Sequence, residues 1–447
     1  MRKILLGTTQ VLLIAAITLP LLGVPAIQRE FGSSQGDVAL MIAAYGLAFG
    51  GLLLAGGRLA DLGGRRTFLA GLAIFAAGSL AAALAPSFAL LLAARFGQGI
   101  GAALVAPAAM VLLRQLTPDP ARRAKALAAW GVLSGIGATF GNLLSGVVLT
   151  WGSWRVAFLA PAVIAAAAAL AGWRLFEPTT ARPARRRIDA LGALLATATM
   201  TLLSYGLLNN AYVAIGGAVV LGVGFVLVER RTADPVLPLG FLADRTRVGG
   251  LAAIFVTAAS MGTMWFMTSL YLQQVKGLSP ILTSLAFLPY VAVQLGTSTL
   301  VSRVVGRFGA RRATPIGLGL AAVGMGLLSR IEPDSPYVGV FLAGLLVFVA
   351  GASLAFSGAM VAATSTASEQ QAGLAGGVAN LAMEAGPTVG LAFLVSLAAS
   401  YAHQTAGYAA AFGVAAIAFV LTAVGVAIAL RQPHKKNEEK LHEYTVS

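Results

Sequence analysis

Fourteen long apolar stretches, each bounded by charged residues or by Pro and Gly, constrain the fold of this chain more than any other feature. A helix of about 20 apolar residues crosses the hydrocarbon core of a bilayer. Helices are expected because lipid leaves every backbone polar group to be satisfied within its own segment. The stretches lie near 5–27, 38–57, 67–86, 88–113, 126–150, 154–173, 190–208, 212–228, 248–271, 280–300, 313–329, 336–363, 373–398 and 408–430. The sequence therefore predicts an all-α integral membrane protein with fourteen transmembrane helices.

The positive charges sort to one side of these predicted helices. Of the 31 Lys and Arg residues, all but five lie at the span ends on the side of the N-terminus. The positive-inside rule makes that side cytoplasmic, and an even number of spans places both termini there. The exceptions are Arg29, Arg155, Lys276 and Arg330 at the opposite ends, and Arg95 within a span. We expect a multi-pass protein of a bacterial inner (plasma) membrane, because heavy Ala and Gly usage suits a GC-rich bacterial genome.

Composition excludes several classes of function. The net charge of +15 is dispersed over short loops that face an anionic lipid leaflet, so membrane lipids rather than nucleic acid are the expected partners. The chain has no Cys, and its three His, at 403, 434 and 442, lie outside the predicted spans. This pattern predicts no disulfide, no metal site and no cofactor. The spans contain no nucleophile–base pair, so we do not expect an enzyme.

A charged, glycine-rich loop at 57–66 returns in degraded form at 302–311, which indicates an internal duplication. Each copy joins the second and third helices of its own half, and a parallel repeat of this kind is typical of transporters. The sequence predicts an N-terminal six-helix bundle at 1–176, a linker with two extra transmembrane helices at 177–247, a C-terminal six-helix bundle at 248–430 and a cytoplasmic tail at 431–447.

The first copy of the loop predicts a conformational latch. Its single acid, Asp61, can pair with Arg65 or Arg66 or face a neighbouring helix N-terminus. Gly57 and Gly64 permit a tight turn. The alternative is an ordinary basic loop that obeys the positive-inside rule. In the second copy a glycine, at 306, replaces the acid, so only the first half is expected to keep the latch.

Two further features lie in the fourth and fifth spans. Arg95 lies several residues inside an apolar run, where a charge usually faces a cavity or a partner. The alternative is an arginine that snorkels to the outer interface. Span five carries Gly131, Gly135, Gly137, Gly141 and Gly146, whose spacing favours close helix contact rather than chemistry.

These elements, in this order and spacing, resemble the major facilitator superfamily, and the two inserted helices point to its fourteen-span drug:proton antiporter family. The resemblance covers the whole chain. It is carried by Gly57, Asp61, Gly64, Arg65 and Arg66, by Arg95 to Gly99, by Trp154, Arg155 and Phe158, and by Tyr271 to Gln273 with Gly277 to Pro280. It implies two six-helix bundles that rock about a midplane cavity and export lipophilic drugs or antibiotics against a proton gradient.

The chain departs from that pattern in two places. The antiporter motif of span five ordinarily has a proline where this chain has Asn142. Many relatives carry an aspartate in span one, but Ala16 to Pro20 contain no acid. A mechanism that depends on that aspartate cannot be transferred to this chain.

One acidic residue stands apart from the other fifteen. Glu384 lies in the middle of a predicted span, whereas the rest lie in loops, in tails or at span ends. Apolar surroundings favour the neutral form of a carboxyl group, which is what a reversible proton carrier requires. We therefore predict proton coupling at Glu384, with Arg95 tuning the potential of the cavity. The alternative is a structural Glu bonded to polar neighbours, among which Asn380 lies one turn away.

Polar, aromatic and methionine side chains in the spans are candidates for a substrate cavity. Met and aromatic residues suit variable apolar ligands, although such residues more often face lipid or core. The candidates are Gln10, Gln98, Asn142, Met264, Trp265, Tyr271, Gln273, Gln294 and Asn380.

The sequence thus favours a monomeric, proton-coupled exporter of lipophilic or amphipathic small molecules. The principal alternative is a facilitator, or a lipid or metabolite exporter on the same scaffold, that is not driven by protons at Glu384. A membrane sensor or scaffold would need an added soluble domain, and Arg431 to Ser447 form only a short charged extension.

Overall fold

The computed structural model describes residues 1–117, 119, 137, 140–149, 152–177, 189–232, 235, 237, 239–366 and 372–430, and within them it contains helices and no strand. The helices are α1 (Arg2–Thr18), α2 (Val24–Phe31), α3 (Gln35–Ala83), α4 (Phe88–Gln115), α6 (Val156–Leu175), α7 (Ala190–Leu208), α8 (Tyr212–Arg231), α9 (Arg245–Leu270), α10 (Pro280–Ala286), α11 (Leu288–Leu328), α12 (Leu342–Ser365), α13 (Ala372–Ala399) and α14 (Gln404–Ala429). Short helical turns lie at Leu21–Gly23, Leu239–Ala243, Tyr271–Val275 and Tyr337–Phe341. The prediction of an all-α protein is confirmed for this part of the chain.

Twelve of the helical segments that the structure describes are long and apolar enough to cross a membrane. The predicted span at 126–150 lies mostly outside the described residues, and its visible part is the short apolar helix Phe140–Leu149. The predicted span at 313–329 forms the second arm of α11. A multi-pass membrane protein is therefore established, while the number fourteen stays a prediction, as do the boundaries of the bundles and of the tail.

The repeated loop bends a long helix in each half of the chain. α3 continues through the first copy with a kink at Gly63, and α11 continues through the second copy with a kink at Gly309. Gly309 has φ of 71°, in the left-handed region that glycine adopts without a steric penalty. The two arms of each bent helix correspond to the second and third predicted spans of their half, so the duplication in sequence is a duplication in structure.

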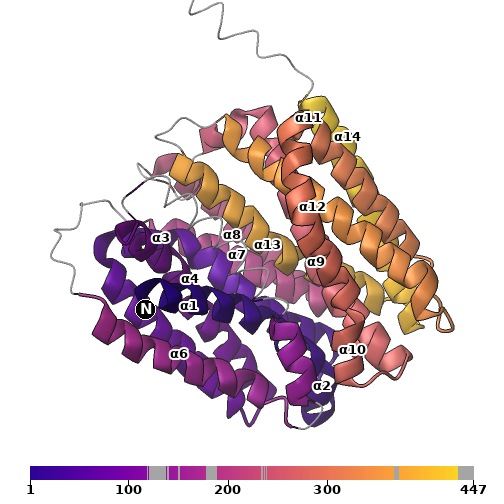
Figure 1. The fold of residues 1–447 in the computed structure, drawn as a ribbon, viewed down its shortest axis with the longest axis horizontal. Helices are drawn as coiled ribbons and strands as arrows, with labels where there is room; N and C mark the ends of the chain where they lie inside the picture. The colour runs from indigo at the N-terminus through magenta and orange to yellow at the C-terminus, as the bar shows by residue number, and fades with distance from the viewer. Residues whose placement is uncertain are drawn as a thin grey trace, which may run out of the picture.

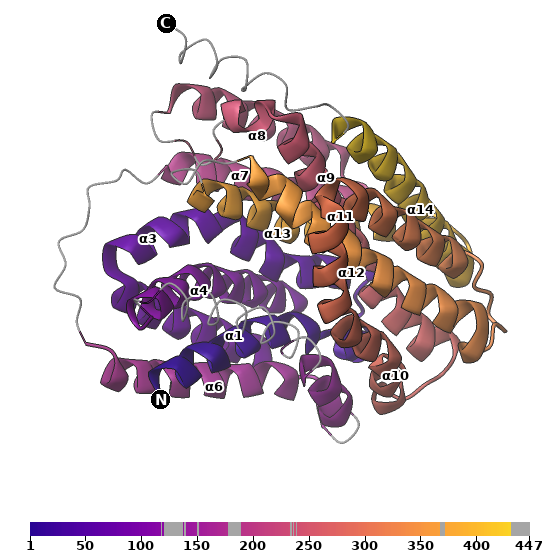
Figure 2. The ribbon, with the colours of Figure 1, turned by 45° about the horizontal axis from the view of Figure 1, so that its top comes forward.

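The helices form two groups that follow the order of the chain (Figure 1). In the first group α3 packs against α4 and α6, and α1 packs against α6 and α4. In the second group α9 packs against α12, α13 and α14, and α11 packs against α12 and α14. The groups meet where α13 packs against α3, and α7 packs against both of these helices. Figure 2 shows α7 and α8 along one side of this junction.

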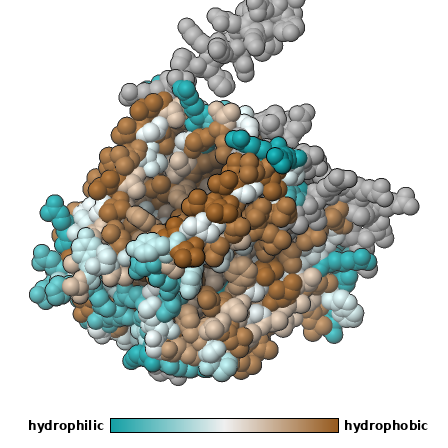
Figure 3. All heavy atoms as spheres, turned by 180° about the vertical axis from the view of Figure 1, so that it is seen from behind, coloured by the Kyte–Doolittle hydropathy of each residue, from teal (hydrophilic) through white to brown (hydrophobic). Residues whose placement is uncertain are grey.

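The surface is that of a protein surrounded by lipid. Apolar residues cover much of the face in Figure 3, and hydrophilic residues gather towards its margins. α8 is the most exposed helix, with Val213 91% and Val220 70% exposed. Because exposed side chains of this kind face acyl chains rather than water, their exposure carries no penalty.

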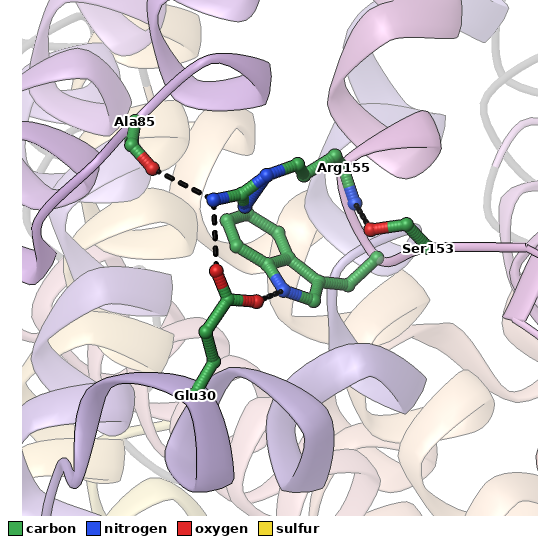
Figure 4. A network of polar contacts seen from close by, with 5 residues as sticks. Glu30, Ala85, Ser153 and Arg155 are labelled. Carbon is green, nitrogen blue, oxygen red and sulfur yellow. Dashed lines mark hydrogen bonds and ion pairs between the residues drawn. The ribbon is translucent and has the colours of Figure 1, made fainter.

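A polar network closes the first group at the end that carries Arg155, which we call the outer side after the orientation predicted above (Figure 4). Arg155 Nη2 donates to Glu30 Oε1 at 2.8 Å and to the carbonyl of Ala85 at 3.0 Å. Trp154 Nε1 donates to the other oxygen of Glu30 at 2.6 Å. Three connections that are distant in sequence are thereby fixed to one another.

Candidate functional site

Glu384 lies at the junction between the two groups of helices, near the middle of α13. A Cβ built on Gly50 of α3 would lie 2.7 Å from the Cβ of Glu384, and one built on Gly46 would lie 3.1 Å from Thr388 Oγ1. Two glycines four residues apart on α3 therefore face two residues four apart on α13, which is one helical turn in each case. We call Gly46, Gly50, Glu384 and Thr388 the midplane seam. Only glycine allows the helices to approach this closely.

The Glu384 side chain is partly buried and is not neutralised by a neighbour. Within the part of the chain that the structure describes, its carboxylate has no hydrogen bond and no ion pair; Thr388 Oγ1 donates to its backbone carbonyl at 3.2 Å. Asn380, one turn away, is exposed and is not bonded to it. A carboxyl group without partners in low-dielectric surroundings is stabilised by taking up a proton or a cationic ligand.

Arg95 has the opposite environment, since it is fully buried and its donors are occupied. Its Nη1 donates to Gln98 Oε1 at 2.6 Å and to the carbonyl of Ala16 at 3.1 Å, and its Nε donates to the carbonyl of Met41 at 3.4 Å. Pro20 has no N–H, so the carbonyl of Ala16, four residues earlier, loses its helical donor. Arg95 replaces that donor and thereby joins α1, α3 and α4.

Tyr45 of α3 packs against Arg95 and directly precedes Gly46 of the midplane seam. The guanidinium of Arg95 is 4.9 Å from the centre of the Tyr45 ring. The Tyr45 hydroxyl donates to the carbonyl of Leu13 at 3.0 Å. Arg95 donates to Gln98 and to backbone carbonyls and forms no ion pair with Glu384.

The loop at 57–66 packs on its own half of the molecule. Arg65 Nη2 donates to the carbonyl of Trp173, in the last turn of α6, at 2.8 Å. A Cβ on Gly64 would lie 3.2 Å from Val111 Cγ1 of α4, one on Gly57 has its nearest neighbour at 3.9 Å, and Arg66 is exposed. The side chain of Asp61 lies outside the described part. The structure therefore shows one anchor of the predicted latch, to α6.

Several predicted cavity residues lie in the packed interior of the second group. Met264, Trp265 and Tyr271 are buried; Trp265 stacks on Phe287 with ring centres 4.1 Å apart, and Tyr271 donates from its hydroxyl to the carbonyl of Glu332 at 2.8 Å. Gln273 Nε2 donates to Ser269 Oγ at 3.0 Å.

The remaining cavity candidates are divided between the interior and the open surface. Gln98 Nε2 donates to Ser79 Oγ at 2.7 Å, in the network of Arg95. Asn142 Nδ2 lies 3.5 Å from the carbonyl of Ser284, across the junction between the groups. Gln10 is buried, Gln294 is partly buried and Asn380 is exposed. None of these side chains contacts the Glu384 carboxylate through a hydrogen bond.

Sequence reasoning missed Tyr45, Gly46, Gly50 and Thr388. The spacing of the two glycines, four residues apart, was the available signal, but it does not say which helix faces them. Two further contacts join the groups at the outer side: Gln274 Nε2 donates to Gln28 Oε1 at 3.1 Å, and Gln35 Nε2 donates to the hydroxyl of Tyr408 at 3.1 Å.

Curated relatives match nearly the full chain. A puromycin resistance protein of Streptomyces alboniger is 34% identical over 425 residues, which cover 92% of this chain and 83% of that protein. A lincomycin resistance protein of Streptomyces lincolnensis is 33% identical over 407 residues, covering 88% and 83%. A cephamycin export protein of Amycolatopsis lactamdurans is 32% identical over 395 residues, covering 84% and 80%.

The fold also matches a solved structure. The crystal structure of a peptide transporter in complex with sulfate superposes with a TM-score of 0.73 at 17% identity, covering 96% of this chain and 94% of that one. The family model of the Major Facilitator Superfamily matches residues 4–390 and 250–444. The chain is a membrane transporter, not an enzyme, and belongs to the major facilitator superfamily.

Proposed function

We propose that this protein exports lipophilic or amphipathic antibiotics in exchange for protons by alternating access, and that Glu384 carries the proton. The observation that carries the proposal is the position of Glu384, a carboxylate without partners among the described residues, in the seam where the two groups of helices meet. The names of the relatives support the substrate class, since they are resistance or export proteins for puromycin, lincomycin and cephamycin.

The seam gives a physical reason for coupling. A charged carboxylate opposes enclosure between apolar helices, because an embedded charge costs at least about 2.5 kcal/mol. Protonation removes this cost and allows α3 to close against Glu384 of α13, as Gly46 and Gly50 of α3 permit. Loss of the proton on the other side of the membrane makes the closed seam unfavourable again. One carboxylate can therefore tie the direction of the conformational change to the direction of proton flow.

In this scheme the structure represents a conformation that is closed at the outer side by hydrogen bonds. Gln28 with Gln274, and Gln35 with Tyr408, hold the two groups together at the outer side. These bonds have to break when the outer side opens to release substrate. Neutral hydrogen bonds suit such a gate, since each contributes only about 0.5–1.5 kcal/mol net.

Arg95 and the loop at 57–66 take supporting parts in this scheme. Arg95 holds the last turn of α1, just before Pro20, so that α1, α3 and α4 move as a unit. Arg65 ties the loop to α6, and with Asp61 it stabilises the state closed to the cytoplasm.

The second candidate is transport that is not driven by protons at Glu384. It is favoured by the absence of an acid between Ala16 and Pro20 and by Asn142, which lies against the carbonyl of Ser284 across the junction. On this scheme transport would not respond when a pH gradient is collapsed.

The test is proton movement in inside-out membrane vesicles with an imposed pH gradient. Puromycin, lincomycin and a panel of lipophilic dyes are added to vesicles with the wild type, with Glu384→Gln or without the protein. Antiport predicts that active compounds collapse the gradient only with the wild type. If no compound collapses it, or if both forms respond alike, the second candidate replaces the first.

A further inference from the structure

The most informative feature outside the seam is the position of α7, the first of the two inserted helices. α7 packs against α3 and α13, the two helices that form the midplane seam. A Cβ on Gly51, the residue after Gly50, would lie 2.8 Å from the Cβ of Thr197 on α7. α7 therefore passes the seam at the level of Glu384.

One face of α7 is buried and the opposite face is exposed. Ala193, Thr197, Ser204 and Leu208 are buried, and they recur at helical spacing on one face. Leu191, Leu194 and Tyr205 are 56%, 60% and 45% exposed. One face of α7 is thus turned to the protein and the other is turned outward, towards α8 and the lipid.

At the described glycines of the seam helices, α7 contacts α3 rather than α13. Besides Gly51 and Thr197, Gly36 at the start of α3 meets the end of α7, where a Cβ would lie 2.6 Å from the carbonyl oxygen of Leu208. These contacts lie fifteen residues apart on α3, so the two helices are in contact along most of the span. No described glycine of α13 has a residue of α7 as its nearest neighbour.

We propose that α7 is a fixed part of the N-terminal group and covers the lipid side of the midplane seam, so that α13 moves against a surface formed by α3 and α7 together. The cover keeps lipid away from Glu384 while the seam opens and closes, because a carboxylate exposed to acyl chains is held neutral and cannot release its proton. This inference rests on the proposed function, in which Glu384 exchanges protons.

The relative motion of α7 can be measured by pulsed electron paramagnetic resonance on spin-labelled cysteines, because the natural chain has no Cys to remove. Suitable label sites are Leu194 on α7, Val163 on α6 and Leu421 on α14, which are 60%, 61% and 67% exposed and lie outside the seam. Distances are compared between acid and alkaline pH, with and without puromycin. The Val163–Leu421 pair is the control, since it reports the motion of one group against the other.

The proposal expects the Val163–Leu421 and Leu194–Leu421 distances to change together while the Leu194–Val163 distance stays constant. If Leu194 instead keeps its distance to Leu421 and changes its distance to Val163, α7 belongs to the C-terminal group and the proposal is overturned. If the Val163–Leu421 distance does not change under any condition, alternating access itself fails, and the proposed function falls together with this inference.

A pair of glycine variants tests the covering role. Gly51→Val forces α7 away from α3, whereas Gly216→Val on α8 is the matched control because nothing lies within 4 Å of a Cβ there. We expect Gly51→Val to lose drug-driven proton movement and Gly216→Val to retain it. A thermal unfolding curve checks that the Gly51→Val protein is still folded. Equal proton coupling in a folded Gly51→Val and in the control would overturn the covering role.

Discussion

Among the residues that the structure describes, Arg95 and Glu384 are charged side chains well inside spans, and their surroundings are opposite. Arg95 is fully buried and bonded to Gln98 and to carbonyls of α1 and α3. Glu384 lies between the two groups of helices with no hydrogen bond or ion pair to any described residue. Both charges are costly in a membrane. The bonded charge of Arg95 holds one half together, whereas the unbonded charge of Glu384 lies between the halves, where the proposed mechanism needs a group that takes up and releases a proton.

Replacing Glu384 by Gln should have the largest effect on transport. The amide keeps the size of the side chain but cannot release a proton. Uphill accumulation of a labelled compound that the wild type exports should fall, in inside-out vesicles, to the level of vesicles without the protein. Exchange of the labelled for the unlabelled compound should persist, because the variant imitates the protonated state. A Glu384→Gln protein that still accumulates the compound would remove the contrast with Arg95.

Replacing Arg95 by Met should have the largest effect on stability. The change leaves the carbonyl of Ala16 and the side chain of Gln98 without their donor, and each such loss costs about 1–3 kcal/mol. The midpoint of thermal unfolding in detergent should fall by several degrees. Arg95→Lys, which restores one donor, should lie between Met and the wild type. Unchanged stability with lost coupling would instead make Arg95 part of the proton path.

Replacing Gly50 by Ala should have an intermediate effect on transport. The new methyl group would lie 2.7 Å from the Cβ of Glu384, so α3 and α13 have to separate, and overpacking of this kind costs about 1–3 kcal/mol. Gly326→Ala is the control, as nothing lies within 4 Å of a Cβ at that position. For a compound that the wild type exports, we expect several-fold slower transport by Gly50→Ala and no change for Gly326→Ala. Equal rates would mean that the seam does not close during the cycle.

Replacing Glu30 by Gln should have the smallest effect of the four. Glu30 forms an ion pair with Arg155 at 2.8 Å, and the two side chains are 43% and 33% exposed, respectively. Exposed ion pairs contribute about 0.2–1 kcal/mol to stability. Thermal unfolding should change little, and Glu30 can still accept from Trp154 through its amide oxygen. If Glu30→Gln lost as much stability as Arg95→Met, the ion pair between Glu30 and Arg155 would be strong despite its exposure, which contradicts this prediction.

The sequence alone predicted where Arg95 and Glu384 lie along their spans. The apolar stretches located the twelve candidate spans among the described residues, and the single acid in the middle of a stretch is Glu384. The sequence also shows that Pro20 leaves the carbonyl of Ala16 without its helical donor. The donor that replaces it is Arg95 of α4, and only the fold reveals that contact.

The direction in which each helix faces could not be predicted from the sequence. Met264 and Trp265 suit apolar ligands by chemistry, and the structure places both in the packed interior of the second group, while their role in a substrate cavity stays a prediction. In a membrane the lipid-facing and the core-facing sides of a helix are both apolar, so hydrophobic periodicity does not distinguish them. The contact of Gly50 with Glu384 joins residues that lie far apart in the chain, and no local pattern encodes it.

Proton release on binding can be measured with purified protein in weakly buffered detergent solution, to which a compound that is active in the vesicle assay is added. If Glu384 carries the proton, the wild type releases protons on binding, and Glu384→Gln binds the same compound without releasing any. Binding without proton release by the wild type, or equal release by the variant, would contradict the assignment of Glu384 as the proton carrier.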